Sequence, residues 1–296
     1  MPIKLVVPNK IFSKLEREIR KFITHKFPYV KEKFFRFRFD RRNPQRPKYD
    51  PNKLFDHICI ETISYCNNNC SFCAASTLYN HKSKTSFMSE QLYMKILNEL
   101  KEINYKGNFG FWCNNEPLVD ERIFDFIKKA RDVLPNSHFS TYTNGILINK
   151  EKAERLLKSG LNRLIISNYH DDFKLLKGVR DVYENLDPNL GDVEICVELK
   201  NNFKSYRARE TLGTDFSLPR PFHLICERPN FEIIVVYDGT VPLCCADATW
   251  EQKMGNVNEQ SLIEIWFSPE YKRIRQALLE SDRSCNYLCA QCDNLQ

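Results

Sequence analysis

The chain has 296 residues, 42% of them hydrophobic, so it can fill the core of one large domain and a smaller one. No apolar run is long enough to cross a membrane and the start, MPIKLVVPNK, is too short for a secretory signal, so a cytoplasmic protein is expected. Twelve cysteines then favour metal ligands or redox chemistry over disulfides. The net charge of +6 arises near the N-terminus, where residues 1–48 hold fifteen Lys or Arg against four acidic residues.

Residues 1–50 are predicted to form a basic N-terminal extension. Apolar residues recur at near-helical spacing over 11–23, which predicts a basic amphipathic helix, and a linker follows it. Packing on the main domain is the simplest interpretation of this helix. Contact with a membrane surface, or with an anionic substrate or carrier, is the alternative. Nucleic acid is disfavoured as a partner because the positive charge does not continue along the chain.

Strand-like and helix-like segments alternate along residues 51–220, which is typical of parallel βαβ units. Strands are expected at 57–65, 108–113, 138–145, 161–169 and 193–202, helices at 89–103, 120–134, 149–160 and 171–186, and a sixth strand and helix within 203–225. Six units are too few for a closed eight-stranded barrel. The predicted fold is therefore α/β, a partial (β/α)6 TIM-like barrel.

The pattern changes in residues 221–296, which are predicted to form a small α+β domain. Residues 230–245 resemble a hairpin around the turn dipeptide Asp238-Gly239, and 261–281 are expected to be helical despite Pro269. A cysteine-rich tail follows. A bound metal would add useful stability to a domain of this size.

Three cysteines, Cys66, Cys70 and Cys73, follow the first barrel strand with the spacing CxxxCxxC. They lie where parallel α/β folds build active sites, at the carboxyl ends of the strands. Thiolate ligands suit zinc or an iron–sulfur cluster. Three protein ligands leave one position of a metal centre open for a small molecule.

The run CNNNCSFC, with Phe72 before the last cysteine, resembles the cluster-binding loop of the radical S-adenosylmethionine (SAM) superfamily. The resemblance implies a [4Fe-4S] cluster whose open iron is chelated by SAM. It also implies that one electron from the reduced cluster cleaves SAM to a 5′-deoxyadenosyl radical, which removes hydrogen from a substrate. The electron would come from a reductant such as flavodoxin or ferredoxin.

Three further segments resemble SAM-binding positions of this family. CNNEPL follows the second strand and is similar to the family's GGEP segment, with asparagines in place of both glycines; Asn is the residue that best tolerates positive φ after Gly. Two more candidates end the third and fourth strands, where an ordinary turn or cap is the alternative interpretation. The candidate SAM-binding residues are Phe72, Asn114, Asn115, Glu116, Pro117, Thr143, Asn144 and Ser167.

The C-terminal cysteines resemble the SPASM extension of this superfamily and its shortened twitch form. The signals are Cys226, Gly239 and Cys244 at the expected spacings, the segment GNVNEQSLIEIW, and the pair Cys289 and Cys292. The resemblance implies one auxiliary [4Fe-4S] cluster held by these four cysteines. Spacing alone also permits a zinc site with the same four ligands.

Five cysteines remain outside these sets. Cys285 is the main rival for the fourth auxiliary ligand, because it repeats the CxxxCxxC spacing with the last two cysteines. Cys59 and Cys196 lie within predicted strands, where buried packing is their expected role. Cys113 and Cys245 are candidate hydrogen donors to a substrate radical, with simple packing as the alternative.

These residues support a radical SAM enzyme that dehydrogenates or epimerises a small polar substrate, such as a sugar, an aminocyclitol or a carrier-linked glycan. A peptide-modifying radical SAM maturase is the alternative, although the N-terminal extension is too short for a recognition domain with its own core. A non-enzymatic zinc protein with a basic interaction arm is the alternative of another class.

Overall fold

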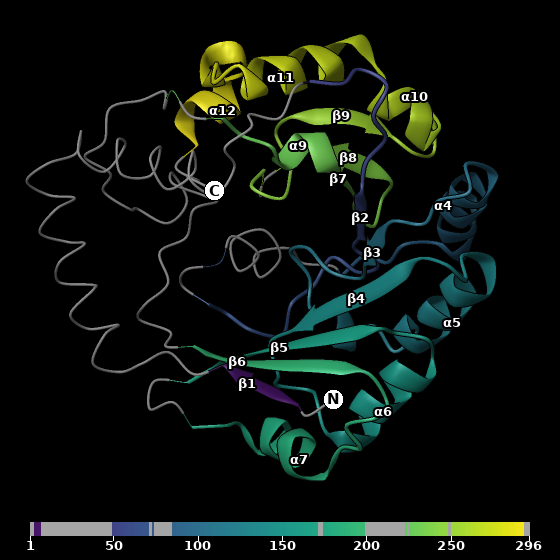
Figure 1. The fold of residues 1–296 in the computed structure, drawn as a ribbon, viewed down its shortest axis with the longest axis vertical. Coiled ribbons are helices and arrows are strands. Elements are labelled where there is room, and N and C mark those ends of the chain that lie inside the picture. Colours follow the sequence, from purple (N-terminus) through teal and green to yellow (C-terminus); the bar gives the residue numbers. More distant parts are fainter. Residues whose placement is uncertain are drawn as a thin grey trace, which may run out of the picture.

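A parallel sheet forms the centre of the computed structural model, which describes residues 3–6, 49–70, 73, 85–170, 174–198, 223, 225–247 and 250–292. The sheet has seven strands in the order β1-β6-β5-β4-β3-β2-β7, and every neighbouring pair runs parallel (Figure 1). The strands are β1 (Lys4–Val6), β2 (His57–Ile60), β3 (Asn108–Gly110), β4 (His138–Thr143), β5 (Arg163–Tyr169), β6 (Asp192–Glu198) and β7 (Glu232–Val235). The predicted α/β class with a partial barrel is confirmed.

Helices cover one face of this sheet. They are α4 (Glu90–Glu102), α5 (Ile123–Val133), α6 (Lys150–Lys158) and α7 (Lys177–Asn185). Alternate strand residues, such as Phe109, Phe139 and Leu164, point into the core beneath the helices and are fully buried. The side chain of Ser89 accepts a hydrogen bond from the Leu92 amide, so the predicted N-cap of α4 is confirmed.

Two strands of this sheet were not expected from the sequence. β1 lies inside the predicted N-terminal extension and pairs with β6 at one edge. β7 lies in the segment predicted as a hairpin, yet it pairs in parallel with β2. All four β7 residues are buried, which suits a parallel strand covered on both faces. The predicted helix at 11–23 and residues 203–222 of the predicted sixth unit lie outside the described residues.

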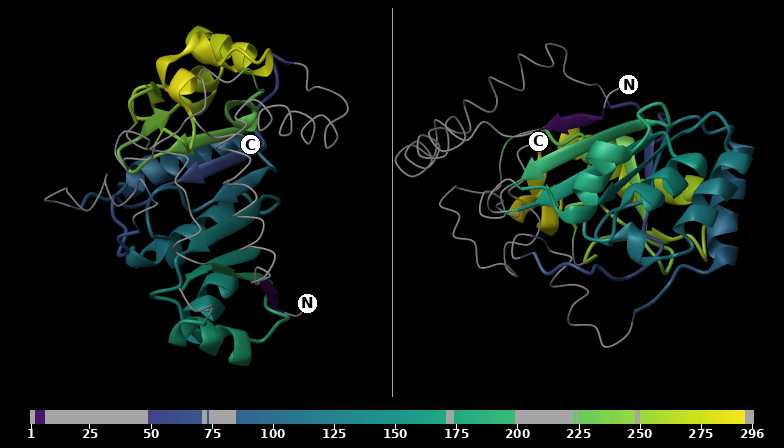
Figure 2. Two further views of the ribbon diagram at one scale, coloured as in Figure 1. Left: turned by 90° about the vertical axis from the view of Figure 1, so that its left-hand side faces the viewer. Right: turned by 90° about the horizontal axis from the view of Figure 1, so that it is seen from below.

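The remaining C-terminal elements pack at one end of the sheet (Figure 2). They are α9 (Arg228–Phe231), the antiparallel pair β8 (Thr240–Pro242) and β9 (Lys253–Asn256), α10 (Leu262–Trp266), α11 (Pro269–Leu279), the 3-10 turn η3 (Arg283–Cys285) and α12 (Tyr287–Gln291). The turn at Gly239 exists, with φ of 85°, but its hairpin partners differ from those predicted. The helix expected over 261–281 is two helices, because Ser268 caps a new helix that starts at Pro269.

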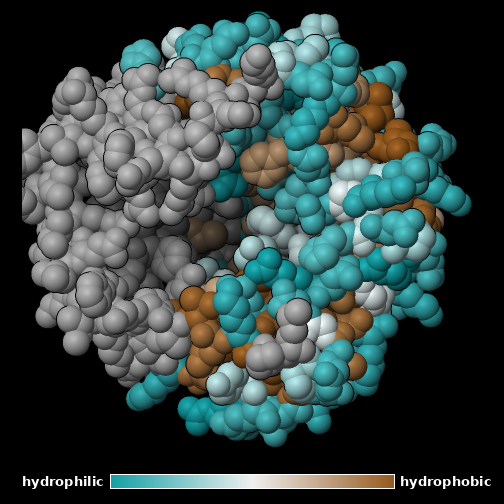
Figure 3. All heavy atoms as spheres, in the orientation of Figure 1, coloured by the Kyte–Doolittle hydropathy of each residue, from teal (hydrophilic) through white to brown (hydrophobic). Residues whose placement is uncertain are grey.

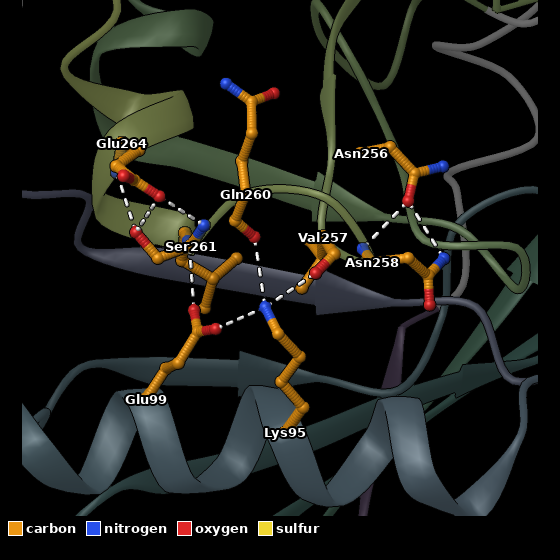
Figure 4. Close-up of polar contacts among 9 residues, drawn as sticks. Lys95, Glu99, Asn256, Val257, Asn258, Gln260, Ser261 and Glu264 are labelled. Atoms are coloured by element: carbon orange, nitrogen blue, oxygen red, sulfur yellow. Dashed lines mark hydrogen bonds and ion pairs between the residues drawn. The ribbon is translucent and has the colours of Figure 1, made fainter.

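Polar contacts fix helix α4 of the barrel to the C-terminal elements (Figure 4). The Lys95 ammonium donates to the carbonyl oxygens of Val257 at 2.6 Å and Gln260 at 3.0 Å, and to Glu99 at 2.6 Å. The other oxygen of Glu99 accepts the Leu262 amide at 2.7 Å, in the first turn of α10. A carboxylate at this point complements the positive end of the helix. The barrel helix therefore satisfies backbone groups of the C-terminal elements.

Within the described ranges, no helix has the length and hydropathy needed to cross a membrane. Hydrophilic residues cover much of the described surface in Figure 3, with hydrophobic patches between them. Leu5 and Val6 of the edge strand β1 contribute exposed hydrophobic side chains.

We expect Lys95→Met to reduce the free energy of unfolding by about 1–3 kcal/mol, because the carbonyl oxygen of Val257 and the carboxylate of Glu99, both in partly buried contacts, lose a charged donor. Urea unfolding of the reconstituted protein would measure this loss. The matched control is Lys101→Met at the end of the same helix, expected to stay within about 0.5 kcal/mol of the wild type. Equal losses in the two variants would contradict a docking role for Lys95.

Candidate active site

The cysteine loop leaves the sheet after β2 and is closed at its base by backbone contacts. The Ser64 amide donates to the Ser86 carbonyl oxygen at 2.9 Å, and the Ser86 amide donates to the Ser64 hydroxyl at 2.8 Å. A single bridge also pairs Ile63 with Phe87. Cys66, Cys70 and Cys73 lie between these closing contacts. The loop therefore starts from a fixed base at the carboxyl end of the sheet.

Glu116 connects this loop to the ends of two strands. Its backbone amide donates to the Tyr65 carbonyl oxygen at 3.0 Å, beside the first cysteine. One carboxylate oxygen accepts the Thr143 hydroxyl at 2.7 Å and the Leu118 amide at 3.1 Å, and the other accepts the Asn144 amide at 2.8 Å. The side chain is 2% exposed, and this burial raises the pKa of Glu116 although the hydrogen bonds oppose it.

Asn144 continues the connection to the thiols. Its side-chain amide donates to the Asn67 side-chain oxygen at 2.8 Å and lies 3.8 Å from the Cys66 sulfur. Burial, with smaller contributions from the charges of Glu116, Cys73 and Cys70, raises the pKa of Cys66 to about 12. The three thiols and the turn at Asn144 thus share one site.

The CNNEPL segment packs into this site without the backbone strain that its asparagines suggested. Positive φ occurs elsewhere among the described residues, not at Asn114 or Asn115, so these asparagines need no left-handed conformation. The buried Asn114 amide donates to the carboxylate of Glu61, and Asn115 accepts the Cys113 amide at 3.2 Å. The Asn115 side-chain nitrogen is buried without a hydrogen-bond partner, which leaves a donor for a bound ligand.

Glu61 is a residue that the sequence reasoning missed. It ends the run HICIE and is fully buried, and its backbone amide donates to the Val235 carbonyl oxygen at 3.0 Å. Its carboxylate positions the Asn114 amide. A glutamate directly after an apolar strand was the available signal. Burial of such a charge is costly unless it is hydrogen-bonded.

The other predicted SAM-binding residues fall at the same end of the sheet, except one that cannot be placed. Pro117 is buried and begins a 3-10 turn, η1 (Pro117–Val119). Ser167 lies near the end of β5 and is half-buried beside Cys196 in the ladder. Phe72 lies outside the described residues.

Four C-terminal cysteines come together although the first and the last are 66 positions apart in the sequence. Cys226 precedes α9, Cys244 follows β8, Cys289 lies in α12 and Cys292 caps its end. Burial raises the pKa of Cys244, and the neighbouring thiols of Cys245, Cys226, Cys292 and Cys289 raise it further. Such a four-thiol set fits an iron–sulfur cluster or zinc.

Cys285 lies beside this group on the 3-10 turn before α12. Its thiol contributes to the raised pKa of Cys289. Its carbonyl oxygen accepts hydrogen bonds from Arg273 at 3.2 and 3.3 Å. That Cys285 is the fourth ligand of the auxiliary cluster stays a prediction.

A buried hydrophobic cluster joins the two groups of cysteines inside the barrel. Its buried members are Cys59, Ile234, Val236, Cys245 and Trp250, and Cys73, Trp112, Cys113 and Tyr237 pack against it. Cys73 from the cysteine loop and Cys245 from the residue after Cys244 therefore touch the same cluster. Both candidate hydrogen donors border it, and Arg228 donates to the Cys245 sulfur at 3.0 Å.

Comparison with known families agrees with this arrangement. A model described as "Radical SAM superfamily" matches residues 60–184, and one described as "SPASM, Iron-sulfur cluster-binding domain" matches residues 226–293. The chain belongs to the radical SAM superfamily and carries a C-terminal SPASM-type iron–sulfur domain. It is a radical SAM enzyme whose cofactors are SAM, a [4Fe-4S] cluster with an open iron site and an auxiliary [4Fe-4S] cluster.

Several individual proteins are similar to the chain. An "S-adenosyl-L-methionine-dependent 2-deoxy-scyllo-inosamine dehydrogenase" of Niallia circulans is 25% identical over 82% of this chain and 95% of its own length. A "GTP 3′,8-cyclase" of Clostridium perfringens is 28% identical over 59% of this chain and 53% of its own length.

Two solved structures resemble the fold. BtrN in complex with AdoMet and 2-DOIA has a TM-score of 0.68 at 25% identity, covering 82% of this chain and 94% of BtrN. SuiB of Streptococcus suis bound to S-adenosylmethionine has a TM-score of 0.52 at 14% identity, covering 93% of this chain and 89% of SuiB, and shows the fold alone.

We expect Glu116→Gln to lower SAM cleavage at least tenfold and to reduce the free energy of unfolding by about 1–3 kcal/mol. The amide group of Gln would place a donor against the Asn144 amide, where the carboxylate now accepts. Anaerobic assay of 5′-deoxyadenosine and chemical unfolding would measure the two effects. Glu121→Gln, an exposed carboxylate five residues along, is the control. Wild-type cleavage by Glu116→Gln would refute the connecting role.

Proposed function

We propose that this enzyme dehydrogenates a hydroxyl-bearing carbon of a small polar substrate of the aminocyclitol or sugar class. The observation that carries the proposal is the buried cluster that Cys73 and Cys245 both contact. A substrate held there would lie between the two groups of cysteines. The similarity to the inosamine dehydrogenase, over nearly its whole length, supports the substrate class.

The proposed ligands rest on cysteine spacing and family resemblance, and the proximity of the thiols supports them. Cys66, Cys70 and Cys73 would hold the first cluster, and Cys226, Cys244, Cys289 and Cys292 the auxiliary cluster. When bound, the first cluster and SAM supply a hydrogen-abstracting radical, and the auxiliary cluster supplies an electron acceptor. The SAM-binding residues would be the segment Asn114–Pro117, the turn Thr143–Asn144 and Ser167.

The protein's own part is to position the substrate and exclude water. Oxidation of an alcohol to a ketone removes two electrons and two protons from the substrate. Ile234, Val236 and Trp250 give the site a buried apolar wall, which protects a reactive intermediate from solvent. Trp112 packs against Tyr142 with ring centroids 4.6 Å apart, and this pair adds an aromatic surface on β3 and β4.

Epimerisation would instead need a thiol that returns a hydrogen atom, and Cys113 and Cys245 remain the candidates. A peptide substrate is the second alternative. The reductant is proposed to be a small electron carrier such as flavodoxin or ferredoxin. A cytoplasmic location, the three-part division at residues 50 and 220, and membrane contact through the basic extension all stay predictions.

Anaerobic reconstitution is expected to give about eight irons and eight sulfides per chain and SAM cleavage to 5′-deoxyadenosine. With a substrate deuterated at the attacked carbon, deuterium should appear in 5′-deoxyadenosine and a ketone should form. Four irons per chain would remove the auxiliary cluster from the proposal. A colourless protein that retains only zinc and leaves SAM intact would contradict the whole of it.

Cys113→Ser and Cys245→Ser separate the two reaction outcomes. If the enzyme dehydrogenates, each variant should keep ketone formation within a few-fold of the wild type, because no thiol hydrogen is consumed. If it epimerises, one of them should lose at least a hundredfold in turnover, and solvent deuterium should enter the wild-type product. Cys196→Ser, on β6, is the control for a half-buried thiol in a strand.

A further inference from the structure

A second polar cluster lies on β2 and at the start of β7, beside the buried cluster that Cys73 and Cys245 contact. His57 and Cys59 share one face of β2, and Glu232 begins the neighbouring strand β7 in register with His57. Cys59 is 1% exposed and Glu232 is 3% exposed. A buried thiol, a half-buried imidazole and a buried carboxylate thus lie together, between a barrel strand and the first strand of the C-terminal segment.

These side chains approach one another nearly as closely as the ligands of one metal ion do. The Cys59 sulfur lies 3.5 Å from Nε2 of His57 and 4.0 Å from Oε2 of Glu232, and Nδ1 of His57 lies 3.7 Å from the same oxygen. Bonds of about 2.0–2.3 Å in a tetrahedral zinc site separate the ligand atoms by about 3.3–3.8 Å. One donor atom from each residue lies within 4.8 Å of the others. A small turn of the imidazole would direct one nitrogen to the common centre.

The buried carboxylate of Glu232 is only partly paired. Its Oε1 is buried and has no hydrogen-bond partner. His57 is the residue that the structure places in ion-pair range of its other oxygen. A buried carboxylate is costly unless it is paired or binds a metal. A cation between the three side chains would neutralise the buried charge and give Oε1 a partner, because both carboxylate oxygens could then serve as ligands.

The neighbouring strand leaves room for the group. Gly110 of β3 faces the cluster, and a Cβ atom there would lie 3.0 Å from Nε2 of His57 and 3.1 Å from the Cys59 sulfur. Any other residue at this position would press the two ligands out of place. Glycine therefore keeps the space around the imidazole and the thiol open.

We propose that His57, Cys59 and Glu232 bind one structural zinc ion that ties β2 to β7. A mixed set of nitrogen, sulfur and oxygen ligands suits Zn²⁺, whereas Ca²⁺ and Mg²⁺ prefer oxygen alone. The two oxygens of Glu232 complete four donors without water. Its ligands are distinct from both cysteine sets, but Cys59 also belongs to the buried cluster that Cys73 and Cys245 contact, so the ion would lie beside the proposed substrate site. The assignment rests on the three side chains and not on the identity of the substrate.

The test uses the full chain, reconstituted anaerobically with iron and sulfide and then given one equivalent of zinc. Metal analysis after desalting should find one zinc per chain beside about eight irons. Zinc X-ray absorption should show one sulfur neighbour at about 2.3 Å and the rest nitrogen or oxygen at about 2.0–2.2 Å. A shell of sulfur alone would place the zinc in an iron–sulfur site and overturn the proposal, as would a protein that retains no zinc.

Cys59→Ser and Glu232→Gln should each lose the stoichiometric zinc and keep the iron. Cys196→Ser is the matched control, because Cys196 is also a strand cysteine near a carboxylate. The Cys196 sulfur lies 3.7 Å from the carboxylate of Glu194, two residues earlier on β6. It should keep both metals. Full zinc occupancy in Cys59→Ser or Glu232→Gln would refute the assignment, whereas loss of iron alone from the wild type would count against the proposed function and not against this site. If a variant fails to fold, the zinc X-ray absorption spectrum of the wild type still shows whether the zinc ligands are the mixed set proposed here.

Discussion

The buried carboxylate of Glu116 is the interaction on which the active site depends. It accepts hydrogen bonds from Thr143, Asn144 and Leu118, while its own amide holds the carbonyl oxygen of Tyr65. Hydrogen bonds to a charged group are about twice as strong as neutral ones, and burial strengthens them further. One residue therefore connects the loop after β3, the end of β4 and the cysteine loop.

Local patterns predicted most of the barrel, because its strands and helices are built from residues close in sequence. Local patterns did not predict the pairing of strands that lie far apart in the sequence. The Asp238-Gly239 turn is real, yet β7 pairs in parallel with β2, about 175 residues earlier, as the outermost strand of the sheet. Its four consecutive buried residues suit a parallel strand that is covered on both faces. β1 has three residues, and its partner β6 is 190 residues away, so no local pattern distinguishes it from a tail.

The active site, too, was predicted where local sequence patterns define it and missed where remote contacts do. Spacing and family resemblance were enough to select Cys66, Cys70 and Cys73, and to include Glu116 and Asn144. Neither showed that Glu116 bonds both to the turn at Asn144 and to the loop before Cys66. The four C-terminal thiols were selected by spacing, and folding brings them together. The cluster of His57 and Glu232 depends on strand register alone, which one sequence does not disclose.

Continuity of the sheet across the C-terminal segment has a chemical consequence. Because β7 is a strand of the barrel sheet, the segment between Cys226 and Cys244 is anchored to β2 through residues 232–235. Lys95 and Glu99 hold the later C-terminal segment at Val257 and Leu262. The two groups of cysteines therefore cannot drift apart without breaking the sheet. A substrate between them would meet both groups at fixed positions, and such preorganisation is what an enzyme that controls a reactive radical requires.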